Sequence, residues 1–323
     1  WAKLADAVDA APGTETTLTD GTKKDMSTFK PTGAGTVDDP YQLSTPEAFA
    51  WWAFKKGGHA KLTANISLFG DNYVGATPGA LDADGIPGNI KNALPWTGTT
   101  VGTNMDGGNF TITHLYGTTG LLSEAVDLRN LTLAEGLVDA TGQTNAQVGA
   151  FASTSSDTNA VFVNLTNQSV AVFGSGDSSN GYAGGIAGSS VGTPSFVNCT
   201  NRAPVSSAHW TGGILGGMKG LPDTVAPQFY LCSNEADIDV SSTAYSIGGG
   251  IAGSAYKGDM EACSNTGAIS AAGDCAGLVV SEPALTGRNC YNAGAVSGAT
   301  YSNDQFGGGT YQDSYYNSAF AAP

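Results

Sequence analysis

The sequence predicts an all-β fold, a right-handed parallel β-helix (β-solenoid) with short capping helices at its N-terminal end. Three observations lead to this prediction. A motif recurs at steps of 27 to 34 residues, the repeats consist of short runs of β-forming residues without a helical period, and small residues, mostly glycine, cluster at one place in each repeat. The 46 glycines show no tripeptide period, so the chain is not collagen-like.

A column of cysteines and asparagines marks the repeat. Asparagine follows two residues after each of four cysteines, which are 33, 31 and 27 residues apart: Cys199 with Asn201, Cys232 with Asn234, Cys263 with Asn265, and Cys290 with Asn292. Leu131 and Leu165 take the cysteine position upstream, at steps of 34, so six coils can be counted. Because leucine shares the position, we interpret the cysteines as small buried apolar groups. The asparagines are expected at corners, where their amides bond turn backbone and the amides of neighbouring coils.

A single repeat is too small to bury its own apolar face, so it has to stack on its neighbours. Parallel strands of successive coils would then pair about 4.8 Å apart, with right-handed crossovers. A β-propeller is the alternative, although its blades of about 40–45 residues are longer than these repeats. Glu261 and Arg288 stand two residues before a cysteine and cannot be buried comfortably, so we expect the strands to begin after that position.

Two short helices are predicted before the repeats, within residues 1–11 and 44–58. The first has apolar residues at helical spacing. In the second, Ser44 or Thr45 suits the N-cap and Gly57 suits the C-terminal stop.

These helices are expected to cover the open edge and apolar interior of the first coil. We therefore divide the chain into an N-terminal cap region, residues 1–60, and one continuous β-helix domain, residues 61–323. An alternative role for the bulky side chains of the second helix is a sugar-stacking platform on Trp51 and Trp52.

Charge excludes several classes of partner. The net charge is −15, and the part from residue 92 onward holds 17 acidic but only 5 basic residues. Such a surface repels phosphate backbones and has no basic stripe, so nucleic acid is not expected as a partner. Anionic lipids and anionic polysaccharides are disfavoured for the same reason. No apolar run approaches the roughly 20 residues of a membrane span.

No set of residues shows catalytic or metal-binding spacing, so we assign no catalytic residue, no metal and no cofactor. His59, His114 and His209 lie in separate contexts, and the cysteines form no CxxC pair. Asp237 and Asp239 alternate along a strand. We interpret them as a solvated face, with the acid pair of a glycosidase as the alternative.

Two polar loops are the candidate ligand-binding edges, residues 174–182 and 298–306. Each ends in polar residues with an aromatic side chain, which is Tyr182 in the first and Tyr301 in the second. Together with Asp237 and Asp239 they are the candidate ligand-binding residues, and they suit neutral glycans or a protein better than polyanions.

Several stretches follow one another in a characteristic order: “GAGTVDDPYQLSTPEAFAWWA” (33–53), “KLTANISL” (61–68), “MDGGNFTIT” (105–113), “VDLRNLTL” (126–133) and “NCYNAGAVSG” (289–298). In wording and order, residues 33–317 resemble the GLUG-motif repeat proteins of bacteria, whose repeats also accompany IgA1-specific zinc metallopeptidases. The resemblance implies a right-handed β-helix with an extracellular address, at the cell surface or in the cell wall. It does not imply peptidase activity, because the HExxH helix is absent.

We therefore expect a secreted or cell-wall-anchored bacterial surface module, either a structural stalk or an adhesin that binds a host glycan or surface protein. A monomer is expected. The alternatives are a carbohydrate-active β-helix enzyme (glycosidase or lyase) and a noncatalytic segment of a larger surface peptidase, so enzymatic activity stays open.

Overall fold

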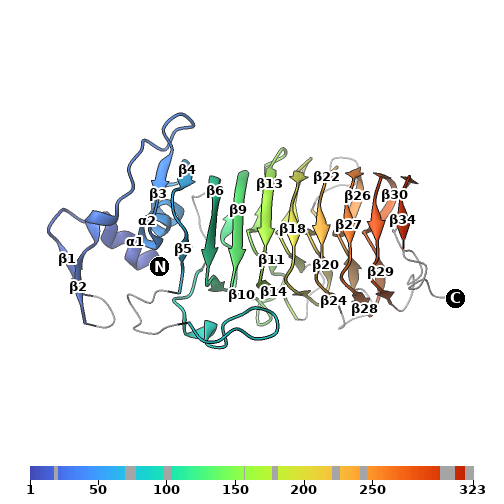
Figure 1. The fold of residues 1–323 in the computed structure, drawn as a ribbon, viewed down its shortest axis with the longest axis horizontal. Coiled ribbons are helices and arrows are strands. Elements are labelled where there is room, and N and C mark those ends of the chain that lie inside the picture. The colour runs from blue at the N-terminus through green and yellow to red at the C-terminus, as the bar shows by residue number, and fades with distance from the viewer. Residues whose placement is uncertain are drawn as a thin grey trace.

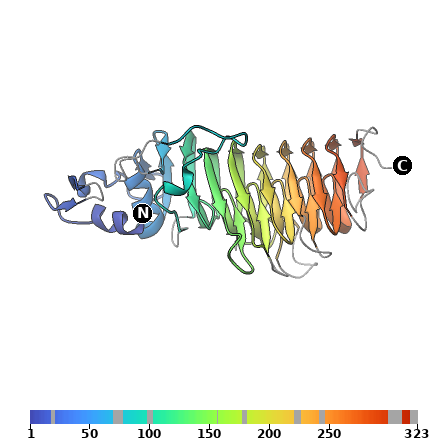
Figure 2. The same ribbon diagram turned by 90° about the horizontal axis from the view of Figure 1, so that it is seen from below.

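The computed structural model is nearly all β, with parallel strands stacked into an elongated body (Figures 1 and 2). It describes residues 1–17, 21–69, 78–97, 103–155, 157–176, 181–219, 226–240, 246–298 and 310–316, without the side chains of 281–284. The helical segments of these residues are short: α1 (Ala2–Val8), the 3₁₀ turn η1 (Met26–Phe29), α2 (Pro46–Trp51), the π-turn η2 (Trp52–Lys56) and the 3₁₀ turn η3 (Ile90–Asn92). Strands β1 (Glu15–Thr17) and β2 (Lys23–Asp25) form an antiparallel pair beside α1.

The two α-helices lie within the predicted ranges and pack at the N-terminal end of the strands (Figure 1). The Thr45 side chain caps α2 by accepting a hydrogen bond from the Ala48 N–H, and Gly57 ends η2 at φ +63°. Trp51 is 3% exposed and Trp52 fully buried. The alternative of an exposed aromatic platform is therefore wrong, because both rings are used to fill the cap.

Strands of successive repeats form three sheets. The seven-stranded sheet contains β7 (Tyr116–Gly117), β10 (Gly136–Asp139), β14 (Val170–Phe173), β19 (Val205–Ser206), β24 (Ile238–Val240), β28 (Ile269–Ala271) and β32 (Val296–Ser297). The five-stranded sheet contains β11 (Gln147–Gly149), β15 (Tyr182–Gly184), β20 (Trp210–Gly212), β25 (Ile247–Gly249) and β29 (Asp274–Ala276).

The third, long sheet holds the remaining strands. Its first part comprises β3 (Tyr41–Leu43), β4 (His59–Leu62), β5 (Ile66–Ser67), β6 (Asn104–Thr113), β8 (Leu122–Glu124), β9 (Asp127–Ala134), β12 (Ala152–Ser155), β13 (Val161–Asn167), β16 (Ala187–Ser190), β17 (Ser195–Val197) and β18 (Thr200–Asn201). Its second part comprises β21 (Leu215–Met218), β22 (Gln228–Tyr230), β23 (Ser233–Asn234), β26 (Ala252–Glu261), β27 (Ser264–Asn265), β30 (Val279–Arg288), β31 (Tyr291–Asn292), β33 (Thr310–Gln312) and β34 (Tyr315–Tyr316).

Pairing within these sheets is parallel and joins equivalent positions of neighbouring repeats. Leu165 is opposite Leu131, and Asn201 lies between Asn167 and Asn234. This pairing contradicts the propeller alternative, whose blades are built from antiparallel strands. Long parallel sheets fit a β-helix or solenoid.

One expectation about the strands is wrong. We expected them to begin after Glu261 and Arg288, yet both residues lie inside strands that run up to the cysteine turn. The residue just before each cysteine adopts a left-handed conformation, as Ala262 does at φ +53° and Asn289 at φ +53°. This turn breaks the two-residue alternation, so the charged side chain points to solvent while the cysteine two residues later points inward.

The interior of the stack is apolar and ordered in columns. Phe162, Phe196 and Phe229 stack on one another from coil to coil, with ring centroids 4.7 and 5.3 Å apart. Outside the stack, residues 78–97 lie over the outer side of the seven-stranded sheet, where Ile86 and Ile90 form a second apolar cluster. This second apolar cluster also includes buried side chains of β10 and β14. The segment therefore covers part of the outer face of the seven-stranded sheet.

Candidate functional site

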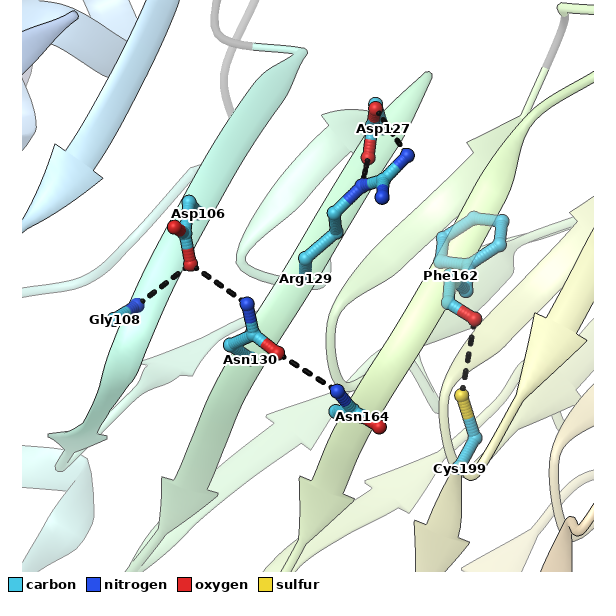
Figure 3. A network of polar contacts seen from close by, with 8 residues as sticks. All are labelled: Asp106, Gly108, Asp127, Arg129, Asn130, Phe162, Asn164 and Cys199. Carbon is cyan, nitrogen blue, oxygen red and sulfur yellow. Dashed lines mark hydrogen bonds and ion pairs between the residues drawn. The ribbon is translucent and has the colours of Figure 1, made fainter.

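The cysteine column lies in the interior and carries no nucleophile. Cys199, Cys232, Cys263 and Cys290 are free thiols with at most 1% exposure. The Sγ of Cys232 lies 3.3 Å from the Phe196 carbonyl oxygen of the preceding coil, and Figure 3 shows the matching contact of Cys199. Burial raises the pKa of Cys290 to about 11 and that of Cys232 and Cys263 well above the ordinary value. A thiol kept protonated and buried does not act as a nucleophile.

Cys275 lies outside this column, in β29 of the five-stranded sheet. It is also buried, and burial raises its pKa to about 11. A difference in reactivity from the four column thiols is therefore not expected.

The asparagines that follow the cysteines form a buried amide ladder. The Nδ2 of the first three donates to the Oδ1 of the next coil, at 2.9 Å from Asn201 to Asn234, 2.7 Å from Asn234 to Asn265 and 2.9 Å from Asn265 to Asn292. Each also donates to a carbonyl of its own turn, such as Asn234 to Ala236 O at 2.7 Å. All four side chains are fully buried, so their hydrogen bonds are made inside the protein rather than to water.

The candidate ligand-binding residues do not come together. Tyr182 is only 7% exposed and stacks on Trp210, with ring centroids 4.6 Å apart. Asp237 and Asp239 are both exposed, and their carboxylates accept hydrogen bonds from Ala268 N at 2.8 Å and Ser270 Oγ at 2.9 Å. Tyr301 lies outside the described residues, as does most of the loop 298–306.

Asp237 lines a hollow of about 610 Å³ at the edge of segment 78–97. Arg202 also lines this hollow and donates two hydrogen bonds, of 3.0 and 3.3 Å, to the carboxylate of Glu235. On the other side, Glu135 is 2.9 Å from His114 Nε2, and His114 Nδ1 is 2.9 Å from Ser67 Oγ. These contacts link equivalent turns of successive coils, so they hold the coils together at this corner.

A second amide ladder runs along the solvent side of the long sheet. We call the outer side of β4, β6, β9, β13, β17, β18, β22 and β23 the front face. On it, Asn198 donates to Asn164 at 2.9 Å, Asn164 to Asn130 at 2.8 Å, and Asn130 to the Asp106 carboxylate at 3.0 Å (Figure 3). These asparagines occupy the left-handed turn position, at φ between +51° and +54°, which asparagine tolerates better than most residues.

Beside the Asp106 end of this ladder, the front face holds a groove of about 290 Å³, which we call the lateral groove. Two rows of three outward side chains form its floor, set by strand register: His59, Asn104 and Asp127 in one row, and Lys61, Asp106 and Arg129 in the other. Val37 and Pro40 stand at its rim.

Charges in the lateral groove are partly paired. Arg129 donates two hydrogen bonds, of 2.5 and 3.0 Å, to the Asp127 carboxylate (Figure 3), and this contact raises the pKa of the guanidinium. The Asp106 carboxylate accepts from Gly108 N at 2.9 Å as well as from Asn130. Carboxylates, a lysine and a histidine thus share one small depression, which the sequence did not reveal because strands β4, β6 and β9 are far apart in the chain.

Two negative findings complete this description. Among the residues that the structure describes, no helix has the length and apolar character to cross a membrane. Nor do these residues contain a group of three or more side chains placed to hold a metal ion.

Comparisons with known proteins give a fold likeness. No protein-family model matches the chain, and no curated protein matches it in sequence. A crystal structure titled as that of “a putative immunoglobulin A1 protease from Bacteroides ovatus” has a similar fold, with a TM-score of 0.59 and 16% identity. The match covers 90% of this chain and 88% of that one. At this identity the likeness concerns the fold alone.

Proposed function

We propose that the chain is a right-handed β-helix of GLUG-type repeats that serves as a stalk or adhesin-type module of a secreted or wall-anchored bacterial surface protein. The observation that carries this proposal is the parallel pairing of neighbouring coils from β3 to β34, in which apolar and amide columns fill the interior and polar side chains cover the lateral faces. Such a stack holds its ends apart and offers long flat sides to a partner. We propose a right-handed coil because crossovers between parallel strands of one sheet are almost always right-handed.

Small-angle scattering and a binding screen test this proposal. Scattering should give a rod whose length grows with the number of coils, and a screen of host glycans and matrix proteins should find at least one ligand for an adhesin. A compact particle would contradict the rod, and a flat screen would leave the stalk role alone.

The lateral groove favours a second candidate function, a carbohydrate-active enzyme. Asp106 and Asp127 lie on neighbouring strands beside Lys61 and His59, and paired carboxylates with a nearby base are what glycosidase or lyase chemistry uses. Release of reducing ends or unsaturated sugars from a polysaccharide, lost in both Asp106→Asn and Asp127→Asn, would establish it.

The fold likeness leaves room for a third role, a noncatalytic segment of a larger surface peptidase. The coding sequence on either side of this segment tests that role. A neighbouring HExxH domain would support it, and a wall-sorting signal would support the adhesin or stalk.

A further inference from the structure

Nine side chains in the middle of the front face form a regular uncharged array, which we call the neutral grid. Three neighbouring coils contribute three residues each: Val163, Asn164 and Thr166; Val197, Asn198 and Thr200; and Tyr230, Leu231 and Ser233. All nine are partly or fully exposed. In a chain of net charge −15, nine neighbouring exposed residues without a charge are a distinct surface.

Charged residues border one of the three rows of the grid at both sides, whereas the neighbours of the other rows, such as Thr132 and Ser264, are uncharged. Arg129 is the register partner of Val163 on the N-terminal side, and Glu261 is the partner of Tyr230 on the C-terminal side. The row of Val163, Val197 and Tyr230 is thus uncharged over three coils, roughly 10 Å between its outer strands at about 4.8 Å per step.

Leu231 is the residue that folding does not explain. It sits in the left-handed turn at φ +56°, where the equivalent positions of three preceding coils and one later coil carry asparagine, and that of the next coil carries the small residue Ala262. A leucine there is strained, because its Cβ crowds the following carbonyl. It is also 59% exposed, so it gains little by burial. An unfavourable backbone and an exposed apolar side chain at one position point to a role outside the fold.

Replacing asparagine by leucine also ends the outer amide ladder. Asn198 donates to Asn164, but within the described residues no donor reaches its Oδ1, because the next coil presents Leu231 instead of an amide. Thr200 Oγ1 is 3.1 Å from Ser233 Oγ beside it. The grid therefore combines an available amide oxygen, a column of hydroxyl groups, an aromatic ring and an exposed aliphatic side chain.

We infer that the neutral grid binds a neutral glycan chain that lies along the rod axis. The inference rests on the proposed surface role. An anionic ligand would be repelled by the net charge, and a cationic ligand would find no carboxylate on the grid. A specific protein partner needs roughly 800 Å² on each side, far more than a strip three strands long. A single sugar chain fits this size, with Tyr230 and Leu231 against its apolar faces and Asn198 and Thr200 bonding its hydroxyls.

Calorimetric titration of the full chain with cellohexaose, mannohexaose and maltohexaose tests the inference, with trigalacturonate as the anionic counterpart. At least one neutral probe should bind, and Tyr230→Ala should weaken it about tenfold, equivalent to about 1.4 kcal/mol. Leu231→Asn should weaken it similarly while raising the melting temperature, because asparagine suits the turn. Asn289→Leu is the matched control: it places leucine in the equivalent turn outside the grid and should lower the melting temperature without changing binding.

Three results would overturn the inference. These are tighter binding of trigalacturonate than of any neutral probe, binding that none of the grid variants changes, and no binding of a neutral probe. If a probe binds but no grid variant changes its binding, the surface role stands and its site lies elsewhere. If no neutral probe binds, small-angle scattering still decides the stalk role.

Discussion

The buried amide ladder makes a strong prediction for Asn234→Ala. In the native protein this side chain accepts from Asn201 at 2.9 Å and donates to Asn265 and to Ala236 O, both at 2.7 Å. Alanine removes all three bonds and leaves a buried donor and two buried acceptors without their partner. At about 1–3 kcal/mol for each of the three orphaned groups, the free energy of unfolding should fall by roughly 3–9 kcal/mol.

Urea denaturation followed by circular dichroism measures this loss, with Asn164→Ala as the control. Asn164 makes the same kind of ladder bonds to Asn130 and Asn198, but on the solvent side, where water replaces the lost partner. In this control variant the free energy of unfolding should fall by about 1 kcal/mol, mainly because alanine is placed at a positive φ. Equal destabilisation by the two variants would refute the reasoning, because burial would then have no bearing on the ladder.

Four further predictions concern the close packing of the coils, the thiols, pH and the cap. An added Cβ at Gly213 would lie 2.2 Å from Gly250 O, so Gly213→Ala should lower the free energy of unfolding by about 1–3 kcal/mol, whereas Gly142→Ala, with open space around it, should be neutral in the same urea titration. The five thiols should react with a thiol reagent only as fast as the protein unfolds, and rapid labelling of the native protein would contradict their interior placement. The raised pKa of Cys275, about 11, means that this thiol loses its proton first in the unfolded chain, so its contribution to stability should be constant below about pH 9 and decline from there towards pH 11; a thermal-melting series that rises between pH 9 and pH 11 would oppose it. Removing the predicted cap, residues 1–60, should expose the buried ring of Trp96 and cause aggregation in size-exclusion chromatography, and a stable monomer would show that the coils need no cap.

The sequence was informative where the repeat is regular. Cys199 and Asn201 could be placed in columns because the same residues return at nearly constant steps. The orientation of Glu261 could not be predicted, because simple strand alternation misses the left-handed residue that follows it. The lateral groove was missed for a different reason. His59 and Asp127 belong to coils with long intervening segments, so their juxtaposition appears only once the strand register is known.

The two amide ladders run in opposite directions, and this gives each coil two unlike sides. In the inner ladder the amide N–H of Asn201 points to the following coil, whereas in the outer ladder that of Asn198 points to the preceding one. The amide dipoles of the two ladders therefore point in opposite directions. Two rods could extend both ladders only by joining head to tail, which is the geometry that produces open filaments. In register after Asn292 stands Tyr316, which has no amide to continue the inner ladder. At the opposite end, helices cover the first strands. The same order of residues that aligns the coils thus also limits their growth into fibres.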